Sequence, residues 1–384
     1  MKFTIDSVTF KSITERASAV SNKTGFTVYE TNVNLIADAE SQMVTVKSTN
    51  LNAFAEVFTY NVSVQESGNV FVDVDDLKRL YNIIGEIIVE SDGKTLLVRG
   101  SKKQGEVCAK EYNNMDFPNV DGEMAFAADK EDMLDTFSKL SCCLESDMSG
   151  TKKLFAGFNV ADVLFRPRIA ALDGYRAAVR VTEWKYRSGL NITIPGYIVK
   201  ELTKVSANKK TEEITVYASD KHARFVGSDF LYTTRLLEGK YLDIDGLLVL
   251  KEQTYAFEIA ADKLFAVAKE YSGFLKKNVQ PMFVAYRNGK FVAAAESSRY
   301  RTSDVLEVKN ERNIPDDLLY GLNPNYLKDL MAIFGKQTVV IESVARGASH
   351  NSWLIRGDNG YTALILPVRP LDDMSNIEKL LVSA

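Results

Sequence analysis

Hydrophobic and polar residues alternate in pairs of short segments that recur along the chain. The pairs are 87–90 with 95–98, 214–217 with 223–226, and 338–341 with 352–355. Such alternation is typical of half-buried antiparallel strands. Turn signals separate segments of this kind, namely Asp92-Gly93, Asn288-Gly289 and Asn359-Gly360. The pattern therefore predicts a protein rich in antiparallel sheet.

Two further phrases recur with a similar spacing. A short helical segment precedes each strand pair, and its three copies are Leu77-Lys78-Arg79-Leu80, Val199-Lys200-Glu201-Leu202 and Leu327-Lys328-Asp329-Leu330, which lie 122 and 128 residues apart. The other phrase joins an apolar start to a helix, and its copies run from Phe3 to Phe10, from Phe126 to Met133 and from Phe257 to Leu264, which lie 123 and 131 residues apart. Any α+β protein shows some echoes, but two phrases that agree on a period favour a true repeat.

The repeat predicts an α+β fold made of three tandem units, each with two helices and roughly eight strands. The predicted domains are 1–121, 122–250 and 251–384. Six helices follow from the pattern, over residues 10–21, 74–84, 129–141, 197–210, 261–277 and 325–336. A last amphipathic segment, 375–382, places Ile377, Leu380 and Leu381 on one stripe.

Composition narrows the class of protein. The chain has 384 residues, of which 46% are hydrophobic and 26% charged, as in an ordinary folded protein. It contains no apolar run of about 18 residues, and an acidic residue, Asp6, stands where a signal peptide needs an apolar stretch. The three cysteines do not form a disulfide framework, because Cys142 and Cys143 are adjacent and Cys108 stands alone. We therefore expect a cytoplasmic protein.

Candidate catalytic chemistry is scarce. The chain has two histidines, His222 and His350, and no nucleotide-binding or nucleophile-elbow motif. Asp173 and Asp220 have no second acid at a fixed local spacing, so we interpret them as turn residues. We expect a protein that is not an enzyme, with no cofactor and no bound metal. A hydrolase or transferase on a repeated scaffold is the rival class.

The distribution of charge favours a basic surface on the helices. The net charge is −4, yet the six predicted helices hold 16 Lys and Arg against 11 Asp and Glu, so they are +5 and the remainder is −9. A basic surface without a groove-reading element binds phosphates and not base edges. The alternative is that these lysines only solubilise exposed helix faces.

Four segments carry a family resemblance. They are Val46-Lys-Ser-Thr-Asn-Leu-Asn52, which is similar to a "TDL" strand with Asn50 in place of Asp; Leu172-Asp-Gly-Tyr-Arg-Ala177, similar to "TDGHRL"; Arg235-Leu-Leu-Glu-Gly-Lys-Tyr241, similar to "RLLEGKYP" with Leu242 in place of proline; and Leu364-Ile-Leu-Pro-Val-Arg369, similar to an "MPMR" ending. In this order, and on a threefold repeat, they resemble the bacterial sliding clamp, the beta subunit of DNA polymerase III.

The resemblance implies a head-to-tail homodimer whose six domains form a ring around duplex DNA. Its implied partners are DNA of any sequence, the catalytic subunit of DNA polymerase III, a clamp loader and a second copy of the chain. It also implies a peptide-binding cleft between the second and third domains, with walls made of Phe155, Gly174, Tyr175, Arg176, Ala177, Leu242, Leu247, Leu364, Leu366, Pro367, Val368 and Arg369. The implied DNA-facing residues are Lys23, Lys78, Arg79, Lys152, Lys153, Lys200, Lys204, Lys209, Lys210, Lys276 and Lys277.

Other interpretations stay open at this point. Leu364 and Leu366 could belong to a core strand, and Arg176 could form an internal salt bridge. The protein could be a phage- or plasmid-type clamp relative with different partners, or an adaptor that never touches DNA. The segment 375–382 could dock beside or across the peptide cleft and reshape access to it, or it could pack on the outside of the third domain or stay frayed.

Overall fold

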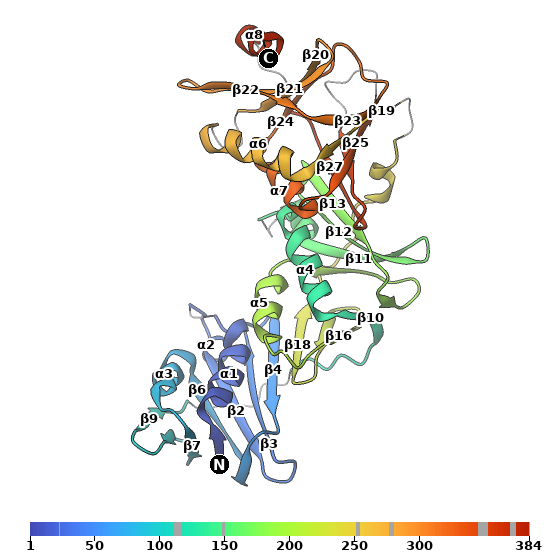
Figure 1. Cartoon of the computed structure of the whole chain (residues 1–384). Coiled ribbons are helices and arrows are strands. Elements are labelled where there is room, and N and C mark those ends of the chain that lie inside the picture. Colours follow the sequence, from blue (N-terminus) through green and yellow to red (C-terminus); the bar gives the residue numbers. More distant parts are fainter. Residues whose placement is uncertain are drawn as a thin grey trace. The chain divides into compact units, whose positions relative to one another are not determined.

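The computed structural model describes residues 1–22, 24–110, 117–147, 150–250, 254–275, 280–344, 352–368 and 374–383. The chain splits into two compact units. The first combines Met1–Asp135 with Trp184–Glu238, and the second combines Thr136–Glu183 with Gly239–Ala384. Both units are built mainly from antiparallel sheet, with helices packed on the sheets (Figure 1).

The first unit holds two sheets. Its strands are β1 (Lys2–Asp6), β2 (Asn32–Asp38), β3 (Met43–Thr49), β4 (Ala53–Thr59), β5 (Ser63–Glu66), β6 (Gly68–Asp73), β7 (Glu86–Ser91), β8 (Thr95–Arg99), β9 (Gln104–Cys108), β10 (Glu123–Asp129), β14 (Lys185–Tyr186), β15 (Asn191–Pro195), β16 (Glu213–Ala218), β17 (His222–Val226) and β18 (Phe230–Arg235). One sheet has the order β5-β1-β7-β8-β9, and the other has the order β14-β10-β16-β17-β18-β4-β3-β2-β6.

Local capping decides where the helices of the first unit begin. These helices are α1 (Ser7–Ala17), α2 (Val28–Thr31), α3 (Val74–Lys78) and α5 (Ile198–Val205), with 3-10 turns η1 (Ser18–Val20) and η2 (Arg79–Asn82). The carboxylate of Asp6 accepts hydrogen bonds from the backbone N–H groups of Val8 and Thr9, so α1 begins three residues before the predicted start at residue 10. Asp73 caps α3 in the same way.

The second unit also holds two sheets. Its strands are β11 (Gly157–Val163), β12 (Arg166–Leu172), β13 (Arg176–Val181), β19 (Thr254–Ala260), β20 (Met282–Arg287), β21 (Lys290–Glu296), β22 (Arg301–Leu306), β23 (Val308–Arg312), β24 (Leu319–Leu322), β25 (Thr338–Val344), β26 (Trp353–Arg356) and β27 (Tyr361–Ile365). One sheet contains the run β11-β12-β13-β27-β26-β25-β19-β23, and the other has the order β22-β21-β20-β24.

Helices cover these sheets. The helices of the second unit are α6 (Ala261–Phe274), α7 (Pro324–Phe334) and α8 (Ser375–Ser383), and α4 (Lys130–Leu140) begins in the first unit and ends in the second. The second unit also contains three 3-10 turns, η3 (Ser141–Cys143), η4 (Gly150–Ala156) and η5 (Asp245–Leu248). A helix is present at each of the six predicted places. However, α3 ends at Lys78 and continues as the 3-10 turn η2, α5 ends at Val205 and not at residue 210, and residues 276–277 lie outside the described residues.

The strand pairing repeats three times along the chain. Strand β1 pairs with β5 and β7, β10 pairs with β14 and β16, and β19 pairs with β23 and β25. A helix follows the first strand of each copy, namely α1, α4 and α6. Each copy thus has nine strands in the described residues, against the roughly eight predicted.

Two strand pairs join consecutive copies. Strand β18 pairs antiparallel with β4, from Phe230 opposite Val57 to Thr234 opposite Ala53. Strand β27 pairs with β13 in the same way, from Arg176 opposite Ile365 to Arg180 opposite Tyr361. The corresponding strands at the two ends of the repeat are β9 and β22. Each lies at the edge of its sheet, with a strand neighbour on one side within the described chain.

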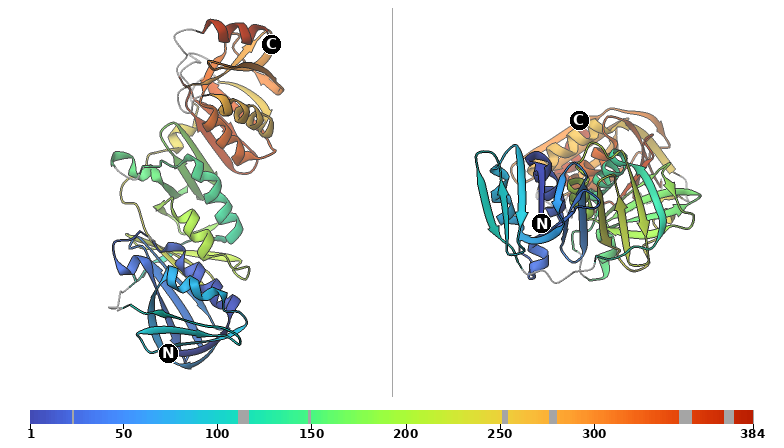
Figure 2. Two further views of the ribbon diagram at one scale, coloured as in Figure 1. Left: turned by 90° about the vertical axis from the view of Figure 1, so that its left-hand side faces the viewer. Right: turned by 90° about the horizontal axis from the view of Figure 1, so that it is seen from below.

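The last helix, α8, packs on the four-stranded sheet of the second unit (Figure 2). Ile377 and Leu381 are buried against residues of β20 and β21, among them Phe283 and Val292. Tyr271 of α6 donates a hydrogen bond to the carbonyl of Ala293, whose side chain points to the opposite face of the sheet from Val292. The apolar stripe of 375–382 is therefore buried on the sheet of β20 and β21 and does not lie across the predicted cleft residues, so that part of the prediction is wrong.

Candidate peptide-binding site and basic surface

A pocket of about 460 Å³ lies in the second unit, between the turn after β12 and the start of α7. It is lined by Leu144, Glu145, Ser146, Asp173, Tyr175, Arg176, Asn325, Tyr326, Lys328 and Asp329. The rings of Tyr175 and Tyr326 stack with 6.0 Å between their centroids, and the Lys152 ammonium lies 5.4 Å from the centre of the Tyr175 ring. Aromatic faces and charged groups therefore surround one opening.

Arg176 forms the polar wall of this pocket. Its Nε donates to Asp173 Oδ2 at 3.1 Å, and its terminal nitrogen donates to Asp329 Oδ2 at 2.9 Å. Its guanidinium carbon lies 4.4 Å from the centre of the Tyr326 ring. Arg176 thus makes the internal salt bridges that the sequence left open, and these contacts fix its orientation at the pocket.

The turn that carries Tyr175 is built by Asp173. The Asp173 carboxylate accepts hydrogen bonds from the backbone N–H of Tyr175 at 2.9 Å and of Arg176 at 3.0 Å. Gly174 lies between them with φ at +88°, a conformation that favours glycine. Asp173 is therefore a turn residue, as predicted.

An apolar surface adjoins the pocket. Leu364 of β27 is buried in a cluster with Ala177, Tyr241 and Ile244, and Phe155 packs against that cluster. This burial agrees with the core-strand alternative for Leu364. Three other predicted cleft residues remain accessible, with exposed fractions of 46% for Leu242, 49% for Leu247 and 42% for Leu366.

One hydrogen bond links the apolar surface to the pocket. The backbone N–H of Leu366 donates to the carbonyl of Tyr175 at 2.9 Å. Pro367 follows Leu366, and Val368 forms a bridge with Gly321 of β24. Arg369 lies outside the described residues.

Sequence reasoning missed the contribution of α7 to the pocket. Tyr326 lies in the first turn of that helix, where the Asn323 side chain accepts hydrogen bonds from the N–H groups of Asn325 and Tyr326. The run Asn323-Pro324-Asn325-Tyr326 is typical of a capped helix start. It did not signal that this start would meet the turn at Tyr175, because 151 positions separate the two tyrosines in the sequence.

The predicted DNA-facing residues occupy different environments. Lys200 and Lys204 lie four residues apart on α5 and are exposed, as are Lys153, Lys209 and Lys210. Lys78 pairs with Asp75 at 3.1 Å and Arg79 with Asp76 at 3.3 Å, while Lys152 lies 4.0 Å from Glu145. Lys23, Lys276 and Lys277 lie outside the described residues. Within this set, α5 and the turn after it carry the densest exposed positive charge.

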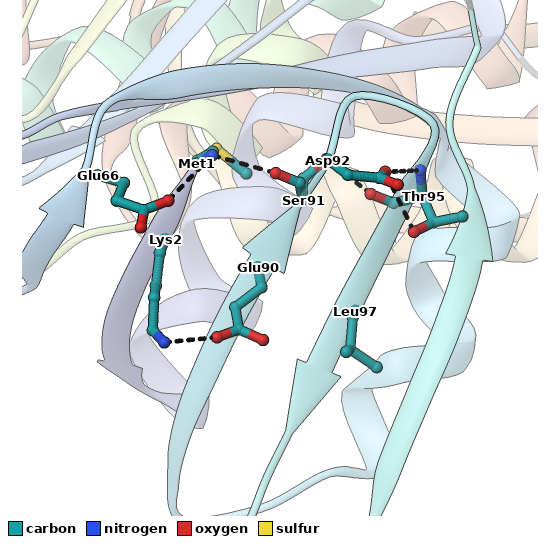
Figure 3. A pocket seen from close by; sticks show the side chains of 8 residues that line it. All are labelled: Met1, Lys2, Glu66, Glu90, Ser91, Asp92, Thr95 and Leu97. Carbon is teal, nitrogen blue, oxygen red and sulfur yellow. Dashed lines mark hydrogen bonds and ion pairs between the residues drawn. The ribbon is translucent and has the colours of Figure 1, made fainter.

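A second pocket lies on the five-stranded sheet of the first unit (Figure 3). Lys2 Nζ pairs with Glu90 Oε1 at 2.7 Å, and the amino group of Met1 donates to the Ser91 carbonyl at 3.1 Å. The hydrogen bond from Lys2 holds the pKa of Glu90 below its usual range. The charged groups here neutralise one another, so this pocket is a weaker candidate than the one beside Tyr175.

The described residues contain neither a metal-binding cluster nor a membrane-spanning helix. No group of three His, Cys, Asp or Glu side chains in this part of the chain could hold a metal ion. No helix there is long and apolar enough to cross a membrane. The three cysteines are free.

Comparisons with known proteins identify the fold. Residues 140–243 match the family model for the central domain of the DNA polymerase III beta subunit. The sliding clamp of Bacillus subtilis superposes with a TM-score of 0.86 at 16% identity, over 97% of this chain and all of that one. The beta subunits of Streptococcus pyogenes and Pseudomonas aeruginosa give TM-scores of 0.85 and 0.83 at 15% and 17% identity, each over 96% of this chain and all of the other. No curated protein matches by sequence.

The chain therefore has the fold of the bacterial sliding clamps, and its central segment matches the beta-subunit family. The predicted family resemblance and fold class are confirmed.

Proposed function

We propose that this protein is a processivity clamp, a ring-shaped homodimer that encircles duplex DNA and tethers a replicative polymerase. The proposed domains are 1–121, 122–250 and 251–384. The observation that carries the proposal is the pattern of joined and free edges. Consecutive copies join through β18 with β4 and through β27 with β13, while β9 and β22 remain as sheet edges. Exposed edges invite pairing with another chain. Pairing of β9 of one protomer with β22 of its partner would repeat the same junction.

DNA would be held by topology and by non-specific phosphate contacts. The exposed lysines on and after α5, Lys200, Lys204, Lys209 and Lys210, support this part of the proposal. Their charge would release counterions from the phosphate backbone without reading base edges. Such contacts allow the ring to move along DNA.

Partners would bind the surface that joins the Tyr175 pocket to Leu242, Leu247 and Leu366. A groove with exposed leucines beside oriented charged groups suits a short peptide that has apolar anchors. The proposed partners are the catalytic subunit of DNA polymerase III and a clamp loader, which would open the ring.

Retention on DNA tests the proposal. The protein would be loaded on nicked circular DNA by a bacterial clamp loader with ATP, and then separated from free protein by gel filtration. We expect it to remain on the circle and to be lost when the circle is cut. Equal loss from both forms would contradict a ring. Retention on the circle without stimulation of a DNA polymerase III catalytic subunit would instead favour a phage- or plasmid-type relative with other partners. Failure to bind any DNA would favour an adaptor.

A further inference from the structure

A buried ion pair lies where the first two copies of the repeat meet. Arg16 of α1 donates to both carboxylate oxygens of Asp229, at 2.6 and 2.7 Å, and its Nε donates to the Val205 carbonyl at 2.8 Å. Arg16 is only 6% exposed. Asp229 lies in the turn between β17 and β18, directly before the strand that pairs with β4. Helix α1 of the first copy of the repeat therefore binds the β17–β18 turn of the second copy through this ion pair.

The repeat fixes which residues correspond to Arg16. Helices α1, α4 and α6 bury the same position of the repeat, occupied by Phe10, Met133 and Leu264. Six residues further along these helices are Arg16, Lys139 and Glu270. Lys139 reaches the start of β27, with its ammonium 5.6 Å from the centre of the Tyr361 ring. The first two helices therefore direct a cation towards the following copy, and the third carries an acid.

The turn that corresponds to Asp229 can be identified in the same way. Gly227-Ser228-Asp229 connects β17 to β18, and Gly100-Ser101-Lys102-Lys103 connects β8 to β9. The first glycine of each turn donates its N–H to the carbonyl three residues later, at 3.1 Å and 2.8 Å. Lys102 therefore occupies the position of Asp229, and both Lys102 and Lys103 are exposed.

Glu270 and Lys102 lie at the two free edges of the repeat. Tyr271, next to Glu270, donates a hydrogen bond at 2.7 Å to Asp304 of the edge strand β22. Glu270 itself is exposed. Lys102 lies two residues before Gln104, the first residue of the other edge strand, β9. At these edges the helix therefore carries the acid, Glu270, and the turn carries the base, Lys102, which is the reverse of Arg16 and Asp229.

We propose that Glu270 of one protomer pairs with Lys102 of its partner, as a charge-reversed version of the Arg16–Asp229 contact. This inference rests on the proposed ring and names the residues that close it. The reversal also gives the junctions an order. Arg16 placed against Lys102, or Glu270 against Asp229, would bring like charges together, which suppresses wrong pairings between domains.

Charge exchange tests the pair in the full-length protein. Glu270→Lys and Lys102→Glu would be made separately and together, with Glu131→Lys on the exposed face of α4 as the matched control. Dimer dissociation constants would be measured by sedimentation equilibrium at low and at high salt. Each single exchange should raise the constant by at least about tenfold, because a dimer contains the contact twice. The double variant should return to within about threefold of the unaltered protein, and the control should not change.

The outcomes separate this inference from the proposed function. A monomeric unaltered protein would overturn the ring itself. A dimer that both single exchanges leave unchanged would overturn the Glu270–Lys102 pair and leave the ring standing. Two single exchanges that weaken the dimer without mutual rescue would also overturn the pair, since direct partners must compensate. Rescue that disappears at high salt supports it.

Discussion

The side-chain amide of Asn50 donates a hydrogen bond to the carboxylate of Glu201, with 3.1 Å between Asn50 Nδ2 and Glu201 Oε1. Tyr232 donates its hydroxyl to the other oxygen at 2.7 Å. Burial raises the pKa of Glu201 to about 7, although the hydrogen bonds from Tyr232 and Asn50 oppose the rise. Asn50 stands where the similar "TDL" strand usually has Asp. Glu201 explains the difference, because an acid at position 50 would face its carboxylate.

Asn50→Asp should destabilise the first unit in a pH-dependent manner. The new carboxylate can still accept the hydrogen bonds from the N–H groups of Asn52 and Ala53, but it repels ionised Glu201. We expect a loss of about 2 kcal/mol or more in unfolding free energy at pH 8, and a smaller loss at pH 5.5, where Glu201 is protonated. Urea unfolding at both pH values measures this loss of unfolding free energy. Asn50→Ser, which removes the amide donor without adding a negative charge, should cost less than Asn50→Asp at pH 8 and should show a weaker pH dependence, because it introduces no like charge beside Glu201.

Glu201 itself should make the unaltered protein less stable as the pH rises. Its folded-state pKa of about 7 lies above the ordinary 4.5. Between these values the folded state binds more protons than the unfolded state, so the stabilisation is complete at low pH and is lost as the pH rises through 7. Relative to Glu201→Ala, the unaltered protein should lose about 1 to 3 kcal/mol between pH 5 and pH 8. A difference that stays constant over this range would contradict the raised pKa.

The Arg16–Asp229 contact should titrate in the opposite direction. Burial acts to raise the pKa of Asp229, but hydrogen bonds from Arg16 and Asn208 outweigh it and hold the pKa below its usual range. The stabilisation is therefore complete above the ordinary pKa of Asp and is lost as the pH falls through the lower folded value. Asp229→Asn should cost about 3 kcal/mol at pH 7, because it leaves Arg16 buried without a charged partner. Denaturant unfolding at pH 7 and pH 3 should show that the cost shrinks in acid.

Helix α8 should stabilise the second unit without affecting peptide binding. Leu381 is buried on the sheet of β20 and β21, and Val382 is exposed. Leu381→Ala should lower the unfolding free energy by about 2 to 4 kcal/mol, whereas Val382→Ala should change it little. Affinity for a clamp-binding peptide should be the same in both variants. A change in peptide affinity with Leu381→Ala would indicate that α8 communicates with the cleft.

Leu366→Asp should abolish partner binding and spare the fold. Leu366 is 42% exposed, so a carboxylate there stays hydrated in the free protein and loses water only when an apolar peptide covers it. We expect at least about a tenfold loss of peptide affinity by fluorescence anisotropy, with an unchanged melting temperature. Leu164→Asp, in the exposed turn between β11 and β12, is the matched control. Unfolding of the Leu366 variant would make the residue part of the core.

The repeat and most of its elements could be predicted from the sequence because they are local. Alternation of apolar and polar residues fixes which side of a strand is buried, so the pairs at 87–98, 214–226 and 338–355 appeared where predicted, as β7 with β8, β16 with β17 and β25 with β26. The two recurring phrases did the same for the helices. The stripe of Ile377 and Leu381 signalled a helix that needs a surface to pack on, but not which surface it would be.

The tertiary structure alone decided which distant groups meet. Arg16 and Asp229 are 213 residues apart, and Asn50 and Glu201 are 151 apart. Nothing in the local pattern distinguishes these side chains from solvated ones. The sequence by itself predicted a threefold repeat and where most of its helices and strands run, since side-chain periodicity acts over a few residues. Which charges are buried, paired or left at a free edge depends on how the copies join, and that is set by strand pairing between segments far apart in the chain.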